Sequence, residues 1–175
     1  MLATDSASKA VRLIVVMGVS GAGKSTVGEA LARRIAVPFI DADHLHPKAN
    51  VQKMRGGEPL ADADRWPWLE IVSRAMVDAA DRNGRVVCAC SALKHAYREV
   101  LRQTSGEPIC FVLLAGDKTV IARRQANRPG HFMPAALLES QFATLEPFEK
   151  DECALTIDVT MDVADIVKEI AAAIG

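Results

Sequence analysis

Eight residues near the N-terminus, GVSGAGKS from Gly18 to Ser25, have the spacing of a loop that binds phosphate. Its glycines allow the backbone to curl so that several N–H groups point inward at phosphate oxygens. Lys24 would add a positive charge beside the β- and γ-phosphates, and Ser25 a hydroxyl for Mg²⁺. The pattern therefore indicates ATP and Mg²⁺ as cofactors. We expect the nucleotide to be held by Gly18, Ser20, Gly21, Ala22, Gly23, Lys24, Ser25 and Thr26.

Two aspartates follow the next apolar run, VPFI (37–40), with one residue between them. If the chain stays extended, Asp41 and Asp43 project to the same side. One can then hold Mg²⁺ while the other accepts the proton of an attacking hydroxyl. Alternatively, one of them only caps the following helix. His44 and His46 could form a transition-metal site with these carboxylates, but no distant cluster completes one.

Basic residues outside the phosphate loop could bind an anionic acceptor. Arg65 precedes a tryptophan pair, Trp66 and Trp68, which we expect to pack at a helix start rather than stack on substrate. Lys94 and Arg98 lie one helical turn apart after the third apolar run. They either bind the acceptor or belong to a solvated helix face.

A proline-bracketed segment, NRPGHFMP (127–134), interrupts two helical patterns and has the composition of a mobile loop. Arg124 and Arg128 lie four residues apart on the helix that enters it, so they share a face. We expect a lid at about residues 124–134 that brings both arginines onto phosphate, although a surface helix would show the same spacing.

Five short apolar runs alternate with amphipathic stretches and must position these residues. The runs are residues 12–17, 37–40, 85–89, 109–114 and 153–158. Their lack of polar alternation is typical of a parallel sheet covered on both faces. The order predicts a three-layer, doubly wound α/β fold with the phosphate loop and the aspartates at the carboxyl edge of the sheet. The helix after the second run should begin near Asp64 or Pro67 and end at Asn83.

Length and composition suit a single domain at residues 11–175, preceded by a disordered extension at 1–10. The formal net charge of −1 gives no electrostatic reason to expect a nucleic-acid or membrane partner. The start lacks the apolar segment of a signal peptide, and we expect a cytoplasmic protein. We expect all four cysteines to be reduced and mostly buried.

Beyond these motifs, the sequence resembles the gluconokinases, which are P-loop kinases related in fold to shikimate kinase and adenylate kinase. The resemblance covers nearly all of the chain after residue 11. Besides the phosphate loop it rests on three strings, DADHLHPKANVQKMRGGEPLADADRWPWL, CSALKHAYREVLR and RRQANRPGHFMPAALLESQFATLE. It implies ATP-dependent phosphorylation of D-gluconate to 6-phosphogluconate by a cytoplasmic homodimer.

The resemblance also implies roles for single residues. By analogy with shikimate kinase, Asp43 matches the carboxylate that contacts the acceptor hydroxyl, Asp41 the one nearer Mg²⁺, and Arg65 an arginine that binds the acceptor's carboxylate. The catalytic set would be Lys24, Asp43, Arg124 and Arg128. Further substrate contacts would be His46, Lys94, Arg98 and His131.

Two other functions fit the same motifs. One is a kinase for another small hydroxy acid or a nucleotide, and the other is a nucleotide-binding regulatory module without turnover. The chain has no N-K-x-D for a GTPase switch. The intact set of Lys24, Ser25, Asp41 and Asp43 argues against a module without turnover.

Overall fold

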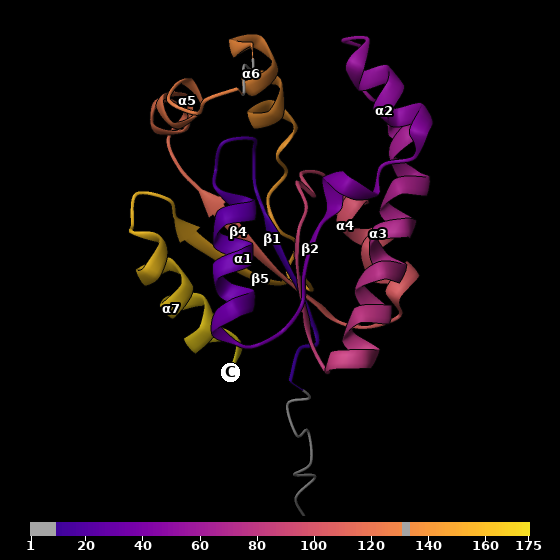
Figure 1. Ribbon diagram of the computed structural model, residues 1–175, viewed down its shortest axis with the longest axis vertical. Coiled ribbons are helices and arrows are strands. Elements are labelled where there is room, and N and C mark those ends of the chain that lie inside the picture. The colour runs from indigo at the N-terminus through magenta and orange to yellow at the C-terminus, as the bar shows by residue number, and fades with distance from the viewer. Residues whose placement is uncertain (1–9, 131–133) are drawn as a thin grey trace, which may run out of the picture.

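A five-stranded parallel sheet lies between two layers of helices in the computed structural model, which describes residues 10–130 and 134–175 (Figure 1). The strands are β1 (Leu13–Met17), β2 (Phe39–Asp41), β3 (Val86–Ala89), β4 (Ile109–Ala115) and β5 (Cys153–Asp158). Their spatial order is β2-β3-β1-β4-β5, and every neighbouring pair is parallel. The predicted doubly wound fold is confirmed, and each apolar run forms one strand.

The helices connect the strands. They are α1 (Lys24–Arg34), α2 (Lys48–Arg55), α3 (Asp62–Asn83), α4 (His95–Ser105), α5 (Lys118–Ala126), α6 (Ala135–Thr144) and α7 (Val163–Ile174), with a short 3₁₀ turn η1 at Ala42–Leu45. Within the described residues, no helix is both long and apolar enough to span a bilayer.

Helix α3 begins at Asp62, earlier than the sequence predicted. The carboxylate of Asp64 accepts a hydrogen bond from the N–H of Ala61 at 2.9 Å and closes the first turn. Two aspartates in that turn also suit the positive end of the helix dipole. Pro67, which we expected near the start, therefore lies inside the helix.

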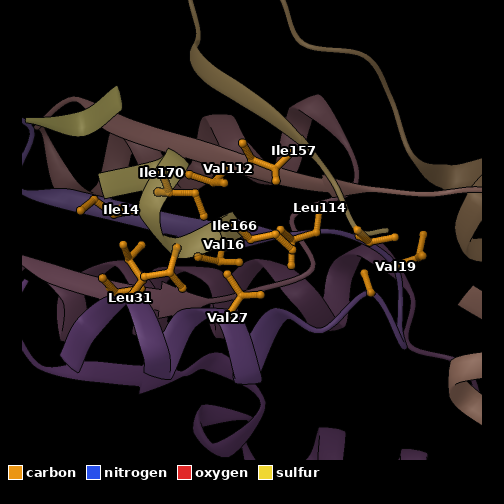
Figure 2. Close-up of a cluster of buried hydrophobic side chains, with 14 of the residues drawn as sticks. Ile14, Val16, Val19, Val27, Leu31, Val112, Leu114, Ile157, Ile166 and Ile170 are labelled. Carbon is orange, nitrogen blue, oxygen red and sulfur yellow. The ribbon is translucent and has the colours of Figure 1, made fainter. Parts of the chain in front are cut away.

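Two apolar cores lie on opposite faces of the sheet. All five residues of β1 are buried, and they alternate between the two cores because successive side chains of a strand point to opposite faces. Figure 2 shows one core, where Ile14 and Val16 meet Leu31 of α1 and Ile166 of α7. Helices α3 and α4 cover the other face. Packing on both sides explains why the strands are continuously apolar.

Arg98 lies inside the protein and not at its surface. Its side chain is fully buried, and Nε and Nη2 donate to the carboxylate of Glu152 at 2.6 and 3.1 Å. Nη1 donates to the carbonyls of Ala92 and Leu93, and Nη2 also to that of Pro147. Every N–H of the guanidinium thus has a protein acceptor. The expectation that Arg98 binds substrate is corrected: it holds three segments together.

Replacing Arg98 distinguishes these two roles. Arg98→Met should destabilise the fold by about 3 kcal/mol or more, because it leaves the buried carboxylate of Glu152 without its partner. The melting temperature should fall by roughly 6 °C or more. Arg102→Met, on the same helix but with partly exposed ion pairs, is the matched control and should melt near the parent. A variant at position 98 with the parental melting temperature and lost activity would restore the substrate role.

Candidate functional site

The phosphate loop joins β1 to α1 at the carboxyl edge of the sheet. Gly18 has φ 146°, and a Cβ there would lie 3.0 Å from the carbonyl oxygen of Leu114. Gly23 has φ 96° and caps the start of α1 without a side chain. The first N–H groups of α1 therefore point into the space that a phosphate would occupy. The local geometry agrees with the nucleotide loop that the sequence predicted.

Lys24 lies at the start of α1, at the end of the phosphate loop. Its Nζ donates to the carbonyl of Val19 at 3.1 Å. Burial lowers the pKa of Lys24, while the charges of Asp43 and Asp41 raise it and that of Arg128 lowers it further. Charges that act on one ammonium in this way must be near it. The fold thus gathers Lys24, both aspartates and Arg128 in one place.

Ser25 and Asp41 are joined directly. The hydroxyl of Ser25 donates to Oδ2 of Asp41 at 3.0 Å, although they come from different strand–helix connections. A hydroxyl and a carboxylate are the oxygen ligands that Mg²⁺ prefers, so this pair fits the ion. The described residues contain no cluster of three or more His, Cys, Asp or Glu side chains able to hold a metal. The described residues therefore give no support for a transition-metal site with His44 and His46.

The chain does not stay extended after Asp41. Oδ1 of Asp41 accepts a hydrogen bond from the N–H of Asp43 at 3.0 Å and caps the turn η1. The expectation of two side chains projecting together from a strand is therefore wrong. Asp41 instead serves as a cap and as a partner of Ser25. Asp43 lies within the turn, and its charge raises the pKa values of Lys24 and His46.

Aromatic side chains line the region beside Asp43. The ring of His46 stacks on Trp68 with 4.1 Å between centroids. The indole of Trp68 donates to the carbonyl of Ala42 at 2.8 Å, so it packs as expected and also fixes η1. Burial lowers the pKa of His46, and the negative charge of Asp43 offsets this shift only in part. The imidazole is therefore mainly neutral at pH 7.

The starts of α3 and α4 form a cluster of charged and aromatic side chains. Tyr97 donates through its hydroxyl to Asp62 at 2.6 Å, and Lys94 donates to the same carboxylate at 3.2 Å. These bonds lower the pKa of Asp62. The guanidinium of Arg65 lies 5.5 Å from the centroid of the Tyr97 ring. Its buried Nε has no hydrogen-bond partner among the described residues, which suits an anionic ligand.

The lid arginines occupy different positions. The guanidinium of Arg124 donates to the carbonyl of Val159, just after β5. Arg128 lies beyond the end of α5, not on it. Its positive charge lowers the pKa of Lys24. The expectation that both share one helical face is therefore wrong. His131, the remaining predicted substrate contact, lies outside the described residues.

Sequence reasoning missed two glutamines that contact the phosphate loop. The N–H of Ser20 donates to Oε1 of Gln141 at 2.6 Å. A Cβ on Gly21 would lie 2.4 Å from Cγ of Gln125, so that side chain packs against the loop. Figure 1 shows α5 and α6, which carry these residues, above the carboxyl edge of the sheet. A neutral amide on a helix gives no signal in the sequence. Asp62 was missed because its partners, Lys94 and Tyr97, lie at the start of another helix.

Known proteins resemble this chain over most of its length. A family model described as an AAA domain matches residues 13–148. The thermosensitive gluconokinase of Escherichia coli (strain K12) is 42% identical over 156 residues, which cover 89% of this chain and 83% of that protein. A crystal structure of a gluconokinase from Sinorhizobium meliloti 1021 has 46% identity and a TM-score of 0.82, covering 94% of this chain and 92% of that one. A shikimate kinase from Acinetobacter baumannii, in complex with shikimate, shares the fold at 20% identity, with a TM-score of 0.60 and coverage of 96% and 95%.

The contact between Gln141 and Ser20 yields a prediction about ATP. Gln141→Glu keeps the length of the side chain but places a negative charge beside the loop. We expect the KM for ATP to rise roughly tenfold because that charge repels the incoming phosphates. Ser140→Glu, an equal charge on an exposed neighbour, should leave this KM near the parental value. Steady-state kinetics at varied ATP would measure both. Equal effects of the two variants would mean that Gln141 does not border the phosphate site.

Proposed function

This chain belongs to the gluconokinase family, and from that premise we propose that it transfers the γ-phosphoryl group of ATP to a terminal hydroxyl of D-gluconate, giving 6-phospho-D-gluconate. The observation that carries the proposal is the position of Asp43. The charge of this carboxylate raises the pKa of Lys24, in the phosphate loop, and that of His46, which stacks on Trp68. A group between a nucleotide site and an acceptor pocket is where a kinase needs its base.

The phosphoryl transfer follows from these positions. The N–H groups of the loop and Lys24 hold the triphosphate, and Ser25 with Asp41 would hold Mg²⁺. When bound, the ion neutralises charge on the β- and γ-phosphates. The acceptor oxygen attacks the γ-phosphorus in line, the bond to the β-γ bridging oxygen breaks, and ADP leaves. Asp43 orients the hydroxyl and takes its proton.

The acceptor's carboxylate would pair with Arg65. Its buried and unpartnered Nε supports this assignment, because a buried donor without an acceptor costs free energy until a ligand arrives. Lys94 is a weaker candidate since its charge is already offset by Asp62. The neutral ring of His46 suits a hydrogen bond to a hydroxyl of the sugar chain.

We propose that residues 124–134 act as a lid, with Arg124 and Arg128 as its arginines. The charge of Arg128 acting on Lys24 supports a position near the γ-phosphate. His131 belongs to this proposal as a substrate contact. The resemblance to gluconokinases further supports a homodimer that works in the cytoplasm, with residues 11–175 as a single domain.

The first test is acceptor-dependent consumption of ATP with a panel of sugar acids and neutral sugars. D-gluconate should be phosphorylated, and kcat/KM for glucose should be lower by roughly a thousandfold or more, because a neutral sugar leaves the buried Nε of Arg65 unpaired. Arg65→Gln should lower kcat/KM for gluconate while changing that for glucose little. Comparable values for gluconate and glucose in the parent would contradict a carboxylate-binding pocket. ATP hydrolysis that ignores every acceptor would contradict the kinase itself.

A second prediction separates the two aspartates. Asp43→Asn keeps the shape but loses the basic oxygen, so kcat should fall by roughly 10²–10⁴ with the KM for ATP little changed. Asp41→Asn should instead raise the concentration of Mg²⁺ needed for half-maximal rate. Kinetics at varied Mg²⁺ and ATP measure both effects. The two roles would have to be exchanged if Asp43→Asn remained active and shifted the Mg²⁺ dependence.

A further inference from the structure

Two cysteines lie opposite each other on the last two strands of the sheet, away from the site. Cys110 of β4 and Cys153 of β5 are register partners. Partners on neighbouring strands point to the same face of a sheet. The thiol of Cys153 also contributes to raising the pKa of Cys110, as a neighbouring thiol does. No step of the reaction uses either side chain.

The spacing of these residues suits a covalent bond. Neighbouring strands lie about 4.8 Å apart. A disulfide joins Cα atoms separated by about 4.4–6.8 Å. Cys153 is the first residue of β5, an edge strand, so a small shift of its backbone disturbs one neighbouring strand only. The bond therefore requires little rearrangement.

The four cysteines differ in their access to solvent. Cys153 is exposed, whereas Cys88, Cys90 and Cys110 are buried. Burial, followed by the contact with Cys153, raises the pKa of Cys110 to about 12. Burial likewise raises the pKa values of Cys88 and Cys90. A reagent in solution therefore meets Cys153 first, and Cys110 is the thiol placed to react second.

We propose that Cys110 and Cys153 form a reversible disulfide by exchange with a low-molecular-weight disulfide such as glutathione disulfide. The thiolate of Cys153 attacks one sulfur of the reagent, a mixed disulfide forms, and one glutathione thiolate leaves and takes up a proton. Cys110 then loses its proton and attacks the sulfur of Cys153, which releases the second glutathione. Two protein thiols are oxidised and one small disulfide is reduced to two thiols.

The bond would close a loop of the chain that contains α5 and α6, because both helices lie between residues 110 and 153. It sits at the amino ends of β4 and β5, at the opposite edge of the sheet from the phosphate loop. The disulfide should therefore stabilise the folded protein without altering phosphoryl transfer.

The test incubates the full chain with glutathione disulfide and follows it by mass spectrometry of peptides, thermal melting and kinase assay. We expect an intramolecular bond between Cys110 and Cys153, a melting temperature raised by about 5–10 °C, and unchanged kcat/KM. Dithiothreitol should reverse the shift. In Cys110→Ala the glutathione should stay on Cys153, and Cys153→Ser should show neither adduct nor shift.

Three results would overturn the proposal. Glutathione that stays on Cys153 in the parent would mean that Cys110 cannot reach its partner. A disulfide between two chains through Cys153 would mean that the exposed thiol reacts outward. A parent left fully reduced, in parallel with a control peptide that becomes oxidised, would mean that the pair is not redox-active.

Discussion

The buried pair of Arg98 and Glu152 is the interaction on which the surroundings of the site depend. Through it, α4 is bonded to the connection that precedes it and to the segment that runs from α6 into β5. The same region is reinforced by Glu146, whose N–H donates to Leu93 and whose carboxylate accepts from the N–H of His95. A buried ion pair is weak evidence of stability, but once formed it permits few arrangements of the chain. Here it holds the start of α4 against the segment that follows α6.

The pair of Arg98 and Glu152 thus supports two sides of the proposed site, the one formed by the start of α4 and the one formed by α6. The start of α4 presents Lys94 and Tyr97 to Asp62 of α3, beside Arg65 of the proposed acceptor site. Helix α6, held at its far end near Leu93, reaches the phosphate loop through Gln141. These two hydrogen bonds therefore connect α6 and the residues after it to the phosphate loop and to the segment before α4.

The sequence alone was sufficient to predict the features that depend on neighbouring residues. Continuous apolar runs predicted the five strands, and the spacing of glycines with Lys24 predicted the phosphate loop, because both signals lie within a few neighbouring residues. Arg98 was misassigned because its partner is 54 residues away, and an arginine one turn after Lys94 resembles a solvated residue until that partner is known. Gln141 was missed for the same reason, since its contact with Ser20 spans 121 residues. Pairings between distant segments have no local signature.

The different roles proposed for Asp41 and Asp43 rest on the turn that the sequence did not predict. Both oxygens of Asp41 already accept hydrogen bonds, one from the N–H of Asp43 and one from Ser25. Asp41 is therefore suited to hold an ion beside Ser25 and to shape the turn. That turn, held also by the bond from Trp68 to Ala42, carries Asp43 out of line with the strand and towards Lys24. A cap on a short helix thus gives two carboxylates of identical chemistry different surroundings, which agrees with the proposed roles of metal ligand for Asp41 and base for Asp43.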